Sequence, residues 1–222
     1  MWPALFLCTA LAVAQPADVP AEAAPALSLP GINLPAQWKN SPQAWKAAEQ
    51  ELTIQAGKQT DWFISPIDEK ASATAPVALF EPASDFVLSA RVRLDAPKQW
   101  EAGFLMAYEN DATWAKLALE VSAYNEPTTV SVVTRGVSDD CNSAIVPGNS
   151  IYLQIAKSGP ALFFYSSPDG RAWRLVRAFR LGSAGRLLTG FGAQSPLGDR
   201  GTAVFSEIKY SARKISDVFK GQ

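Results

Sequence analysis

Short runs in which apolar and polar residues alternate recur along most of this chain, and they constrain its fold more than any other feature. In FVLSARVRL (86–94), Ser89, Arg91 and Arg93 fall on one face of an extended strand, because strand side chains alternate sides, and the other face is entirely apolar: Phe86, Leu88, Ala90, Val92 and Leu94. Turn-forming sequences such as SPDG, SPLGDRG and VPGN separate these runs. One of them, SSPDGRAW (166–173), predicts a hairpin corner at its Asp-Gly pair.

The predicted strands are short and numerous, and long helical stripes of apolar residues are missing. The strands span about residues 51–56, 61–65, 77–81, 85–95, 100–108, 113–122, 128–135, 150–157, 160–166, 172–181, 187–194 and 201–211. Many short strands joined by turns favour an all-β fold. We therefore predict an antiparallel two-sheet sandwich of the jelly-roll kind.

Composition narrows the chemistry that such a sandwich can carry. The chain has 222 residues and is 48% hydrophobic, which is enough for one globular core. Its 20 basic and 21 acidic residues give a net charge of -1, so no general attraction to nucleic acid or to an anionic membrane is expected. The chain contains no histidine. This excludes Ser–His–Asp and Cys–His nucleophile pairs, histidine metal sites and imidazole pH switches.

The N-terminal 36 residues have the pattern of an export signal followed by a linker. Residues 1–14 form an apolar run that ends in Ala-Val-Ala, a pattern that favours signal-peptide cleavage, and the run is too short to span a bilayer. Residues 15–36 carry regularly spaced prolines among alanines, which predicts a disordered tether. We therefore expect a secreted or periplasmic protein with one folded domain over residues 37–222 and no transmembrane segment.

Cleavage after residue 14 would leave Cys141 as the only cysteine, so no disulfide is expected within the mature chain. A partly buried structural thiol and a reactive thiol both fit this residue. Asp139, Asp140 and Asn142 lie close to it in sequence and offer oxygen donors of the kind that Ca²⁺ prefers. No pattern supplies the remaining ligands, so a solvated acidic loop explains these residues better than a Ca²⁺ site does. We therefore predict no metal and no cofactor.

The stretch WEAGFLMAYENDATWAKLALEV (100–121) predicts a hairpin with one core face and one polar face. With a period of two, Phe104, Met106 and Tyr108 share a face on its first strand. On the second strand the residues from 115 to 121 with odd numbers are apolar and face the core. The other face of that strand carries Trp114, Lys116 and Glu120. An indole, an ammonium and a carboxylate on one sheet face indicate a candidate site.

Seven stretches of the chain together resemble one protein family. They are QWKNSPQAW (37–45), QTDWF (59–63), EAGFLM (101–106), TWAKLALE (113–120), SVVTRGVSD (131–139), YSSPDGRAW (165–173) and GAQSP (192–196). In this order they resemble the concanavalin-A-like, lectin/glucanase-fold domain of unknown function that includes the "regulation of enolase" protein. The resemblance extends from Trp38 to about Ser211 and implies a two-sheet sandwich with a concave face, on which such folds often hold sugars.

The resemblance also implies which residues recur at the site. Trp114, Lys116, Glu120, Ser138 and Asp139 stand where the family has its recurrent polar and aromatic residues. The chain departs from the family at WEAG (100–103), where the family has Asp-Gln-Ala-Gly, and at position 140, where an aspartate replaces the usual tryptophan. The resemblance does not imply a particular activity.

A short turn around residues 111–112 would pair the two strands of the hairpin so that Gly103 lies opposite Glu120. Glu101 then falls diagonally beside Glu120 on the same face, about 7–8 Å away at the backbone. Trp114 offers an indole that can stack on a sugar ring, and Arg135 would join the same face from the next strand. This face is the predicted binding site.

Three functions fit these residues. The first is a lectin-like domain that binds a glycan or polysaccharide through the predicted site, with no catalysis. The second is a glycoside hydrolase in which Glu101 and Glu120 are the two catalytic carboxyl groups. The third is a protein-interaction domain without a ligand, because sandwich folds have many roles. The sequence does not determine the sugar or the oligomeric state.

Overall fold

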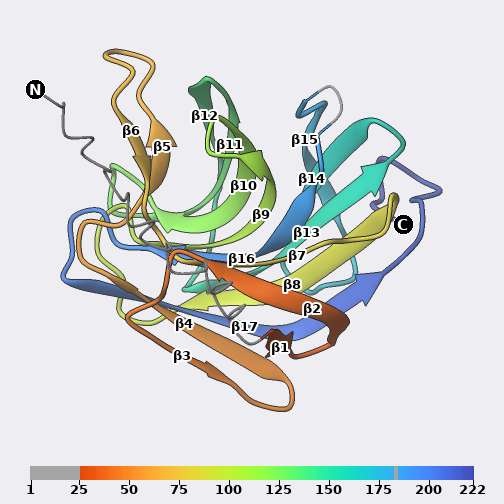
Figure 1. Cartoon of the computed structure of the whole chain (residues 1–222), viewed down its shortest axis with the longest axis horizontal. Helices are drawn as coiled ribbons and strands as arrows, with labels where there is room; N and C mark the ends of the chain where they lie inside the picture. Colours follow the sequence, from red (N-terminus) through yellow and green to blue (C-terminus); the bar gives the residue numbers. More distant parts are fainter. Residues whose placement is uncertain (1–25, 183–184) are drawn as a thin grey trace, which may run out of the picture.

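The computed structural model of the chain describes residues 26–182 and 185–222. The regular elements of these residues are β-strands, and two antiparallel sheets pack against each other (Figure 1). This confirms the predicted all-β class and the two-sheet sandwich. In the part of the chain that is described, no helix has the length and apolar character needed to cross a membrane. The expected signal peptide at residues 1–14 lies outside the described residues.

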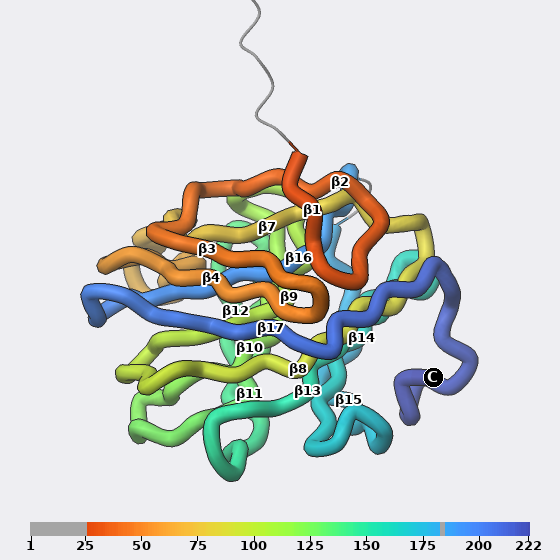
Figure 2. The backbone as a smooth tube through the Cα atoms, turned by 90° about the horizontal axis from the view of Figure 1, so that it is seen from below, coloured from red at the N-terminus to blue at the C-terminus, as the bar shows by residue number. Residues whose placement is uncertain are grey.

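The larger sheet has eight strands and the smaller sheet has seven. In spatial order the larger sheet contains β1 (Leu27–Leu29), β2 (Ile32–Lys39), β7 (Val77–Phe80), β16 (Leu188–Gln194), β9 (Ala102–Asn110), β10 (Thr113–Val121), β11 (Pro127–Arg135) and β12 (Val137–Ile145). The smaller sheet contains β15 (Arg174–Phe179), β14 (Ala161–Ser167), β13 (Ser150–Ser158), β8 (Phe86–Leu94), β17 (Arg200–Ser211), β4 (Glu51–Gly57) and β3 (Ala44–Ala47). Figure 2 shows the strands of the smaller sheet side by side. A separate hairpin consists of β5 (Trp62–Ile64) and β6 (Ala71–Ala73).

The main hydrophobic core lies between the two sheets. Alternation along β8 places Leu88 and Val92 in this core, where both side chains are fully buried, and leaves Arg91 exposed on the outer face. The same core contains Leu117, which comes from β10 of the larger sheet, and Phe205, which comes from β17 of the smaller sheet. The alternation read from FVLSARVRL is therefore confirmed.

A second apolar cluster covers the outer face of the larger sheet. Trp62 of β5 packs there against residues of β7, β9, β10 and β11, including Phe104, Met106 and Trp114. The β5–β6 hairpin stands over this face, and the sheet curls beside it (Figure 1). The larger sheet is therefore buried on both sides beneath the hairpin. This explains why β9 has apolar residues on both faces in the sequence.

All twelve predicted strands are present, with ends within two residues of those expected. The corner in SSPDGRAW also forms as predicted. The Ser167 hydroxyl accepts a hydrogen bond from the Gly170 N–H at 3.0 Å, and the Asp169 carboxylate accepts one from the Arg171 N–H at 2.9 Å. Gly170 has a φ of 68°, which the Asp-Gly turn requires of its second residue.

The prediction of a disordered tether is wrong for the part of it that begins at Leu27. From Leu27 onward the segment forms β1 and the beginning of β2, although residues 15–36 were expected to be a disordered linker. Leu27, Leu29 and Ile32 are buried in the main core, and Ala36 pairs with Phe80 of β7. Proline is compatible with a strand near a sheet edge, and three apolar side chains supply the burial that a tether lacks. Residues 15–25 lie outside the described residues.

Three further strands were missed because their sequences do not alternate in the usual way. They are β3, whose residues are all exposed, the short β6, and β12 at the edge of the larger sheet. The sequence VSDDCNSAI (137–145) of β12 has few apolar residues, and Ser138 is its one buried residue. An edge strand has one neighbour, and polar side chains protect such an edge against pairing with another chain.

Candidate functional site

A cavity of about 260 Å³ opens on the outer face of the larger sheet, between the sheet, the β5–β6 hairpin and the loop before β9. Its polar lining consists of Asp61, Lys116, Glu120, Asp140 and Gln194. Its apolar lining consists of Phe63, Trp100, Val132 and Pro196. The residues come from segments far apart in the chain, because β10, β11, β12 and β16 belong to one sheet and β5 crosses over it. The cavity thus combines a charged floor with an aromatic rim.

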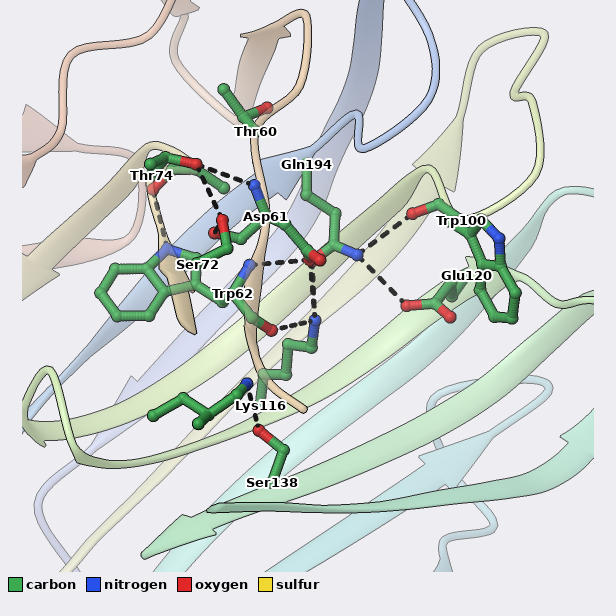
Figure 3. Close-up of polar contacts among 12 residues, drawn as sticks. Thr60, Asp61, Trp62, Ser72, Thr74, Trp100, Lys116, Glu120, Ser138 and Gln194 are labelled. Atoms are coloured by element: carbon green, nitrogen blue, oxygen red, sulfur yellow. Dashed lines mark hydrogen bonds and ion pairs between the residues drawn. The ribbon is translucent and has the colours of Figure 1, made fainter. Parts of the chain in front are cut away.

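The amino group of Lys116 organises the floor. The side chain is 2% exposed, and its Nζ donates to the Trp62 carbonyl oxygen at 2.8 Å and to Gln194 Oε1 at 2.7 Å. Asp61 Oδ1 lies 3.8 Å from the same nitrogen (Figure 3). Burying an ammonium costs several kcal/mol, on the order of the desolvation penalty for one ion, unless the ammonium is paired and hydrogen-bonded. The three oxygens around Lys116 meet this requirement and fix the position of β5 over β10.

Gln194 connects the cation to a carboxyl group. Its Nε2 donates to the Trp100 carbonyl oxygen at 3.1 Å and to Glu120 Oε2 at 3.4 Å, while its Oε1 accepts from Lys116 (Figure 3). The carboxamide therefore presents its acceptor to the ammonium and its donor to the carboxyl group. This arrangement sets the orientation of Gln194 and holds Glu120 at the cavity wall.

Two carboxyl groups of the cavity have raised pKa values. Burial raises the pKa of Glu120 to about 8, and the charges of Asp140 and Asp61 add to this while the Lys116 charge opposes it. Burial also raises the pKa of Asp140 above its ordinary value, again against the effect of Lys116. At neutral pH Glu120 is therefore mostly protonated and can donate a hydrogen bond as well as accept one. Perturbed carboxyl groups that gather in one cleft are typical of functional sites.

Trp100 forms the rim of the cavity in an unusual backbone conformation. Its φ is 67°, a left-handed value that is costly for a residue with a bulky side chain. The Trp100 N–H donates to the Val121 carbonyl oxygen at 2.7 Å, and its carbonyl oxygen accepts from Gln194. These two bonds hold the strained residue beside Glu120 (Figure 3), with the indole only partly buried. A partly exposed indole at a polar cavity offers a flat surface for an apolar ring face.

The hairpin that covers the cavity is tied to the sheet at several points. The Ile64 N–H donates to the Ser138 hydroxyl at 2.9 Å, and that hydroxyl also bonds to the Thr134 hydroxyl at 2.8 Å. The Trp62 Nε1–H donates to the Ala75 carbonyl oxygen at 2.8 Å. Ser138 is buried and serves to anchor β5 on β12.

Sequence comparison decides the family of this chain. The model of the family DUF1349, described as a protein of unknown function, matches residues 38–213. The chain belongs to the DUF1349 family. This confirms the resemblance found in the sequence, because the family has the concanavalin-A-like, lectin/glucanase type of sandwich fold. Among curated proteins, none matches this sequence.

Solved structures share the fold of this DUF1349 domain. A functionally unknown protein from Saccharomyces cerevisiae has 22% identity and a TM-score of 0.74, with 80% of this chain and 96% of that chain covered. A GH43 protein from Bacillus licheniformis has 16% identity and a TM-score of 0.63, with 80% of this chain and 37% of that chain covered. The carbohydrate-binding module CBM66 from Bacillus subtilis has 14% identity and a TM-score of 0.51, with coverage of 82% and 96%. These likenesses show the fold.

The DUF1349 domain does not use Trp114 as a stacking platform, so this prediction is wrong. Trp114 is fully buried in the outer apolar cluster, and its ring meets Trp62 edge-on with centroids 5.5 Å apart. The indole therefore packs beneath the β5–β6 hairpin. The partly exposed indole at the cavity belongs to Trp100.

The predicted register between β9 and β10 is also wrong, by one residue. Asn110 pairs with Thr113 across the expected turn, but the next pair is Tyr108 with Trp114, so Glu109 forms a bulge. A shift of one residue moves every side chain of β9 to the other face. Phe104, Met106 and Tyr108, which we expected in the main core, therefore lie in or beside the outer cluster with Trp114.

The bulge separates the two predicted catalytic carboxyl groups. Glu120 now pairs with Ala102, and Glu101 lies on the opposite face of β9 from Ala102. Glu101 is 3% exposed, accepts a hydrogen bond from the Ser195 hydroxyl at 2.9 Å and borders a different hollow from the one that holds Glu120. Glu101 and Glu120 therefore do not form an acid pair, which corrects the predicted hydrolase mechanism and removes Glu101 from the site.

Arg135 and Asp139 are likewise outside the cavity. Arg135 neighbours Thr134, whose partner Trp114 faces the hairpin, so Arg135 points to the other side of the sheet. Asp139 forms an ion pair with Arg177 of the smaller sheet at 2.9 Å. The expected acidic loop is the edge strand β12, in which Asp139 and Asp140 point to opposite faces. Lys116 and Glu120 line the cavity, whereas Ser138 anchors the hairpin.

Several residues of the cavity were not predicted from the sequence. Asp61, Phe63 and Gln194 lie in QTDWF and GAQSP, stretches that identified the family without indicating a site. For Trp100 and Asp140, the departure of each residue from the family pattern was the sequence signal that could have indicated a place in the site. Among the described residues, no group of three or more side chains of the His, Cys, Asp and Glu types is placed to hold a metal ion. Cys141 is exposed on β12 and free.

Proposed function

We propose that this domain binds carbohydrate in the cavity between the β5–β6 hairpin and Trp100. The observation that carries the proposal is the partly exposed indole of Trp100, held in a strained conformation at the edge of a cavity with charged and amide groups. Sugar rings present an apolar face and a ring of hydroxyl groups. An aromatic surface next to several hydrogen-bonding groups complements both features.

The polar groups divide into two roles. Lys116 and Gln194 are occupied by each other and by Trp62, Asp61 and the Trp100 backbone, so they position the wall of the cavity. Glu120 and Asp140 keep oxygen atoms that can accept hydrogen bonds from sugar hydroxyls. Because its pKa is about 8, Glu120 can also donate at neutral pH.

The structural neighbours support a glycan as the ligand. They include a carbohydrate-binding module and domains of GH43 proteins, and a domain of this fold needs no catalytic residue to hold a sugar. A glycan or polysaccharide is therefore the proposed partner. The burial of Trp114 favours the alternative of an interaction domain without a ligand, whereas the open cavity beside Trp100 favours a ligand.

The test is a glycan array with the full chain, followed by calorimetric titration of the best oligosaccharide. Trp100→Ala should weaken binding by about tenfold or more, since loss of a stacked aromatic ring costs at least the ~1.4 kcal/mol that a tenfold change represents. Trp45→Ala is the matched control, because Trp45 is 47% exposed on β3 and does not line the cavity. An array without any binding, or equal losses in the two variants, would exclude the proposal.

Glycoside hydrolysis is the second candidate function, with Glu120 and Asp140 in place of the predicted pair. It is favoured by the raised pKa of Glu120, which supplies a protonated carboxylic acid in the same cavity as a second carboxyl group. Glu120→Gln and Asp140→Asn should each abolish any measured release of reducing sugar. Activity that persists in both variants would remove these residues from the mechanism.

We further propose export to the periplasm or the medium, on the basis of the apolar run and Ala-Val-Ala site in residues 1–14. Export places a glycan-binding domain where polysaccharides are abundant. Cell fractionation, with N-terminal sequencing of the mature chain, tests this. A chain that keeps Met1 and remains in the cytoplasm would contradict it.

A further inference from the structure

A second hollow, of about 590 Å³, lies on the outer face of the smaller sheet. The floor comes from β8 and β13, and the walls come from β17, the corner after β14 and the segment that follows Ser211. The outer face of this sheet points away from the larger sheet, so the hollow shares no residue with the Trp100 cavity. The sequence predictions and the proposed function leave this hollow without a role.

Three cations border the hollow without a charged partner. Arg171, Lys209 and Arg213 are exposed, and none of them forms an ion pair with another residue in the ranges 26–182 and 185–222. They come from three separate segments: the corner, β17 and the chain after β17. These cations come from separate segments and outnumber the two carboxylates of the hollow, Asp169 and Glu207, so its opening carries a net positive charge.

The two carboxylates of the hollow are already occupied by donors. Asp169 accepts from the backbone N–H groups of Arg171 and Ala172, each at 2.9 Å. Glu207 accepts from the Tyr152 hydroxyl at 2.6 Å. The first two bonds hold Asp169 within the corner, and the third ties Glu207 of β17 to Tyr152 of β13. Neutral donors leave both carboxylates charged, so an incoming anion is attracted by the excess of three cations over two carboxylates around the hollow.

The floor of the hollow is polar and shaped for hydrogen bonding. The hydroxyl of Ser89 and the carboxamide of Gln154 lie there, side by side in the pairing of β8 with β13. Gln154 is 4% exposed and is held by a hydrogen bond from its Nε2 to the Gly221 carbonyl oxygen at 2.9 Å. A bulge between Ser206 and Lys209 interrupts the pairing of β17 with β8 next to this floor.

We propose that this hollow is a second ligand site, which takes an acidic saccharide, a sugar unit that carries a carboxylate or a sulfate group. The guanidinium groups and the ammonium recognise the anionic group through charge-assisted hydrogen bonds. The hydroxyl and carboxamide of the floor bind sugar hydroxyls. The volume is in the range of small-molecule sites. The domain then has one saccharide site on each outer face.

The experiment titrates the full chain with trigalacturonate, with its methyl ester as the neutral match, and with a sulfated galactose trisaccharide. Lys209→Gln with Arg213→Gln removes two cations of the hollow. Arg174→Gln with Arg180→Gln removes two exposed cations of the same charge outside it. The hollow variant should bind the acidic trisaccharide about tenfold or more weakly, and the control within about twofold of the wild type.

The two acidic probes distinguish the source of the charge. Binding of the carboxylated or the sulfated trisaccharide that is lost in the hollow variant supports the proposal and names the anionic group. Weak or no binding of both, equal binding of the methyl ester, or equal losses in the two double variants would overturn it. Because the two hollows share no residue, the hollow variant should bind a neutral oligosaccharide of the Trp100 cavity as the wild type does, so failure here is separate from failure at that cavity.

Discussion

At the scale of single residues, buried charge determines how the Trp100 cavity behaves. Lys116 is paired and hydrogen-bonded, whereas Glu120 is buried close to two other acids. Burial disfavours an ionised carboxyl group more strongly than the nearby ammonium favours it, and the pKa of Glu120 therefore rises. The same residue thus supplies a hydrogen-bond donor to the cavity and a dependence of stability on pH.

The pH dependence has a definite sign. The pKa of Glu120 is about 8 in the fold against an ordinary value of 4.5, so between these pH values the folded chain holds a proton that the unfolded chain has lost. The free energy of unfolding therefore contains a contribution that is complete below about pH 4.5 and is lost as the pH rises to about 8. Glu120→Gln cannot ionise and should remove this loss. Its stability relative to the wild type should rise across that range by on the order of a few kcal/mol.

Urea unfolding of both chains from pH 4 to pH 9 measures this difference. The difference between the two free energies of unfolding should be flat below about pH 4.5, increase, and become flat again above about pH 8. Other titrating groups contribute equally to both chains and cancel in the difference. Parallel curves would show that the pKa of Glu120 is close to its ordinary value.

At the scale of elements, the β5–β6 hairpin forms the Trp100 cavity by covering the larger sheet. It pairs with neither main sheet as a strand, and its position depends on side chains: Trp62 in the outer cluster, the Lys116 ammonium and the Ser138 hydroxyl. A hairpin held in this way should open more easily than the sheet beneath it. Opening would uncover Trp114 and remove Asp61 from the cavity.

Ser138→Ala tests the attachment of the hairpin. It leaves the Ile64 N–H without its acceptor, which costs about 1–3 kcal/mol for a buried donor. Amide hydrogen exchange should become faster in β5 and β6, while β8 and β17 keep their protection. Ser166→Ala, a substitution on β14 in the other sheet, is the control. Uniform acceleration across both sheets would mean that Ser138 supports the whole fold instead.

At the scale of the whole molecule, the N-terminal strands complete the sandwich. β1 and β2 extend the larger sheet beyond β7, and Leu27, Leu29 and Ile32 join the main core. The family match begins at residue 38, inside β2. The segment before it is therefore part of the folded core of this chain, although its composition resembles a linker.

Truncation measures what the N-terminal strands contribute. A chain that starts at residue 37 should unfold at lower urea than one that starts at residue 26, because it loses β1, five of the eight residues of β2 and the buried side chains of Leu27, Leu29, Ile32 and Ala36. The expected loss of unfolding free energy is several kcal/mol. Each large core side chain that is removed contributes at most on the order of 2–5 kcal/mol. Equal unfolding midpoints for the two chains would restore the tether interpretation for residues 26–36.

The sequence by itself determined the strands, the sandwich and the family. Alternation along β8 and turn residues such as Asp169-Gly170 are local signals, and each acts within a few residues of itself. The tertiary structure decided the site. β9 is apolar on both faces, so alternation left either face free to join the core, and the bulge at Glu109 selected one of them. Whether an indole is buried or exposed then depended on the β5–β6 hairpin, which packs on β10 from some fifty residues away along the chain. This long-range packing buried Trp114 and left Trp100 at the opening. The local sequence pattern contains no signal of such packing, so it could not show which indole would be exposed.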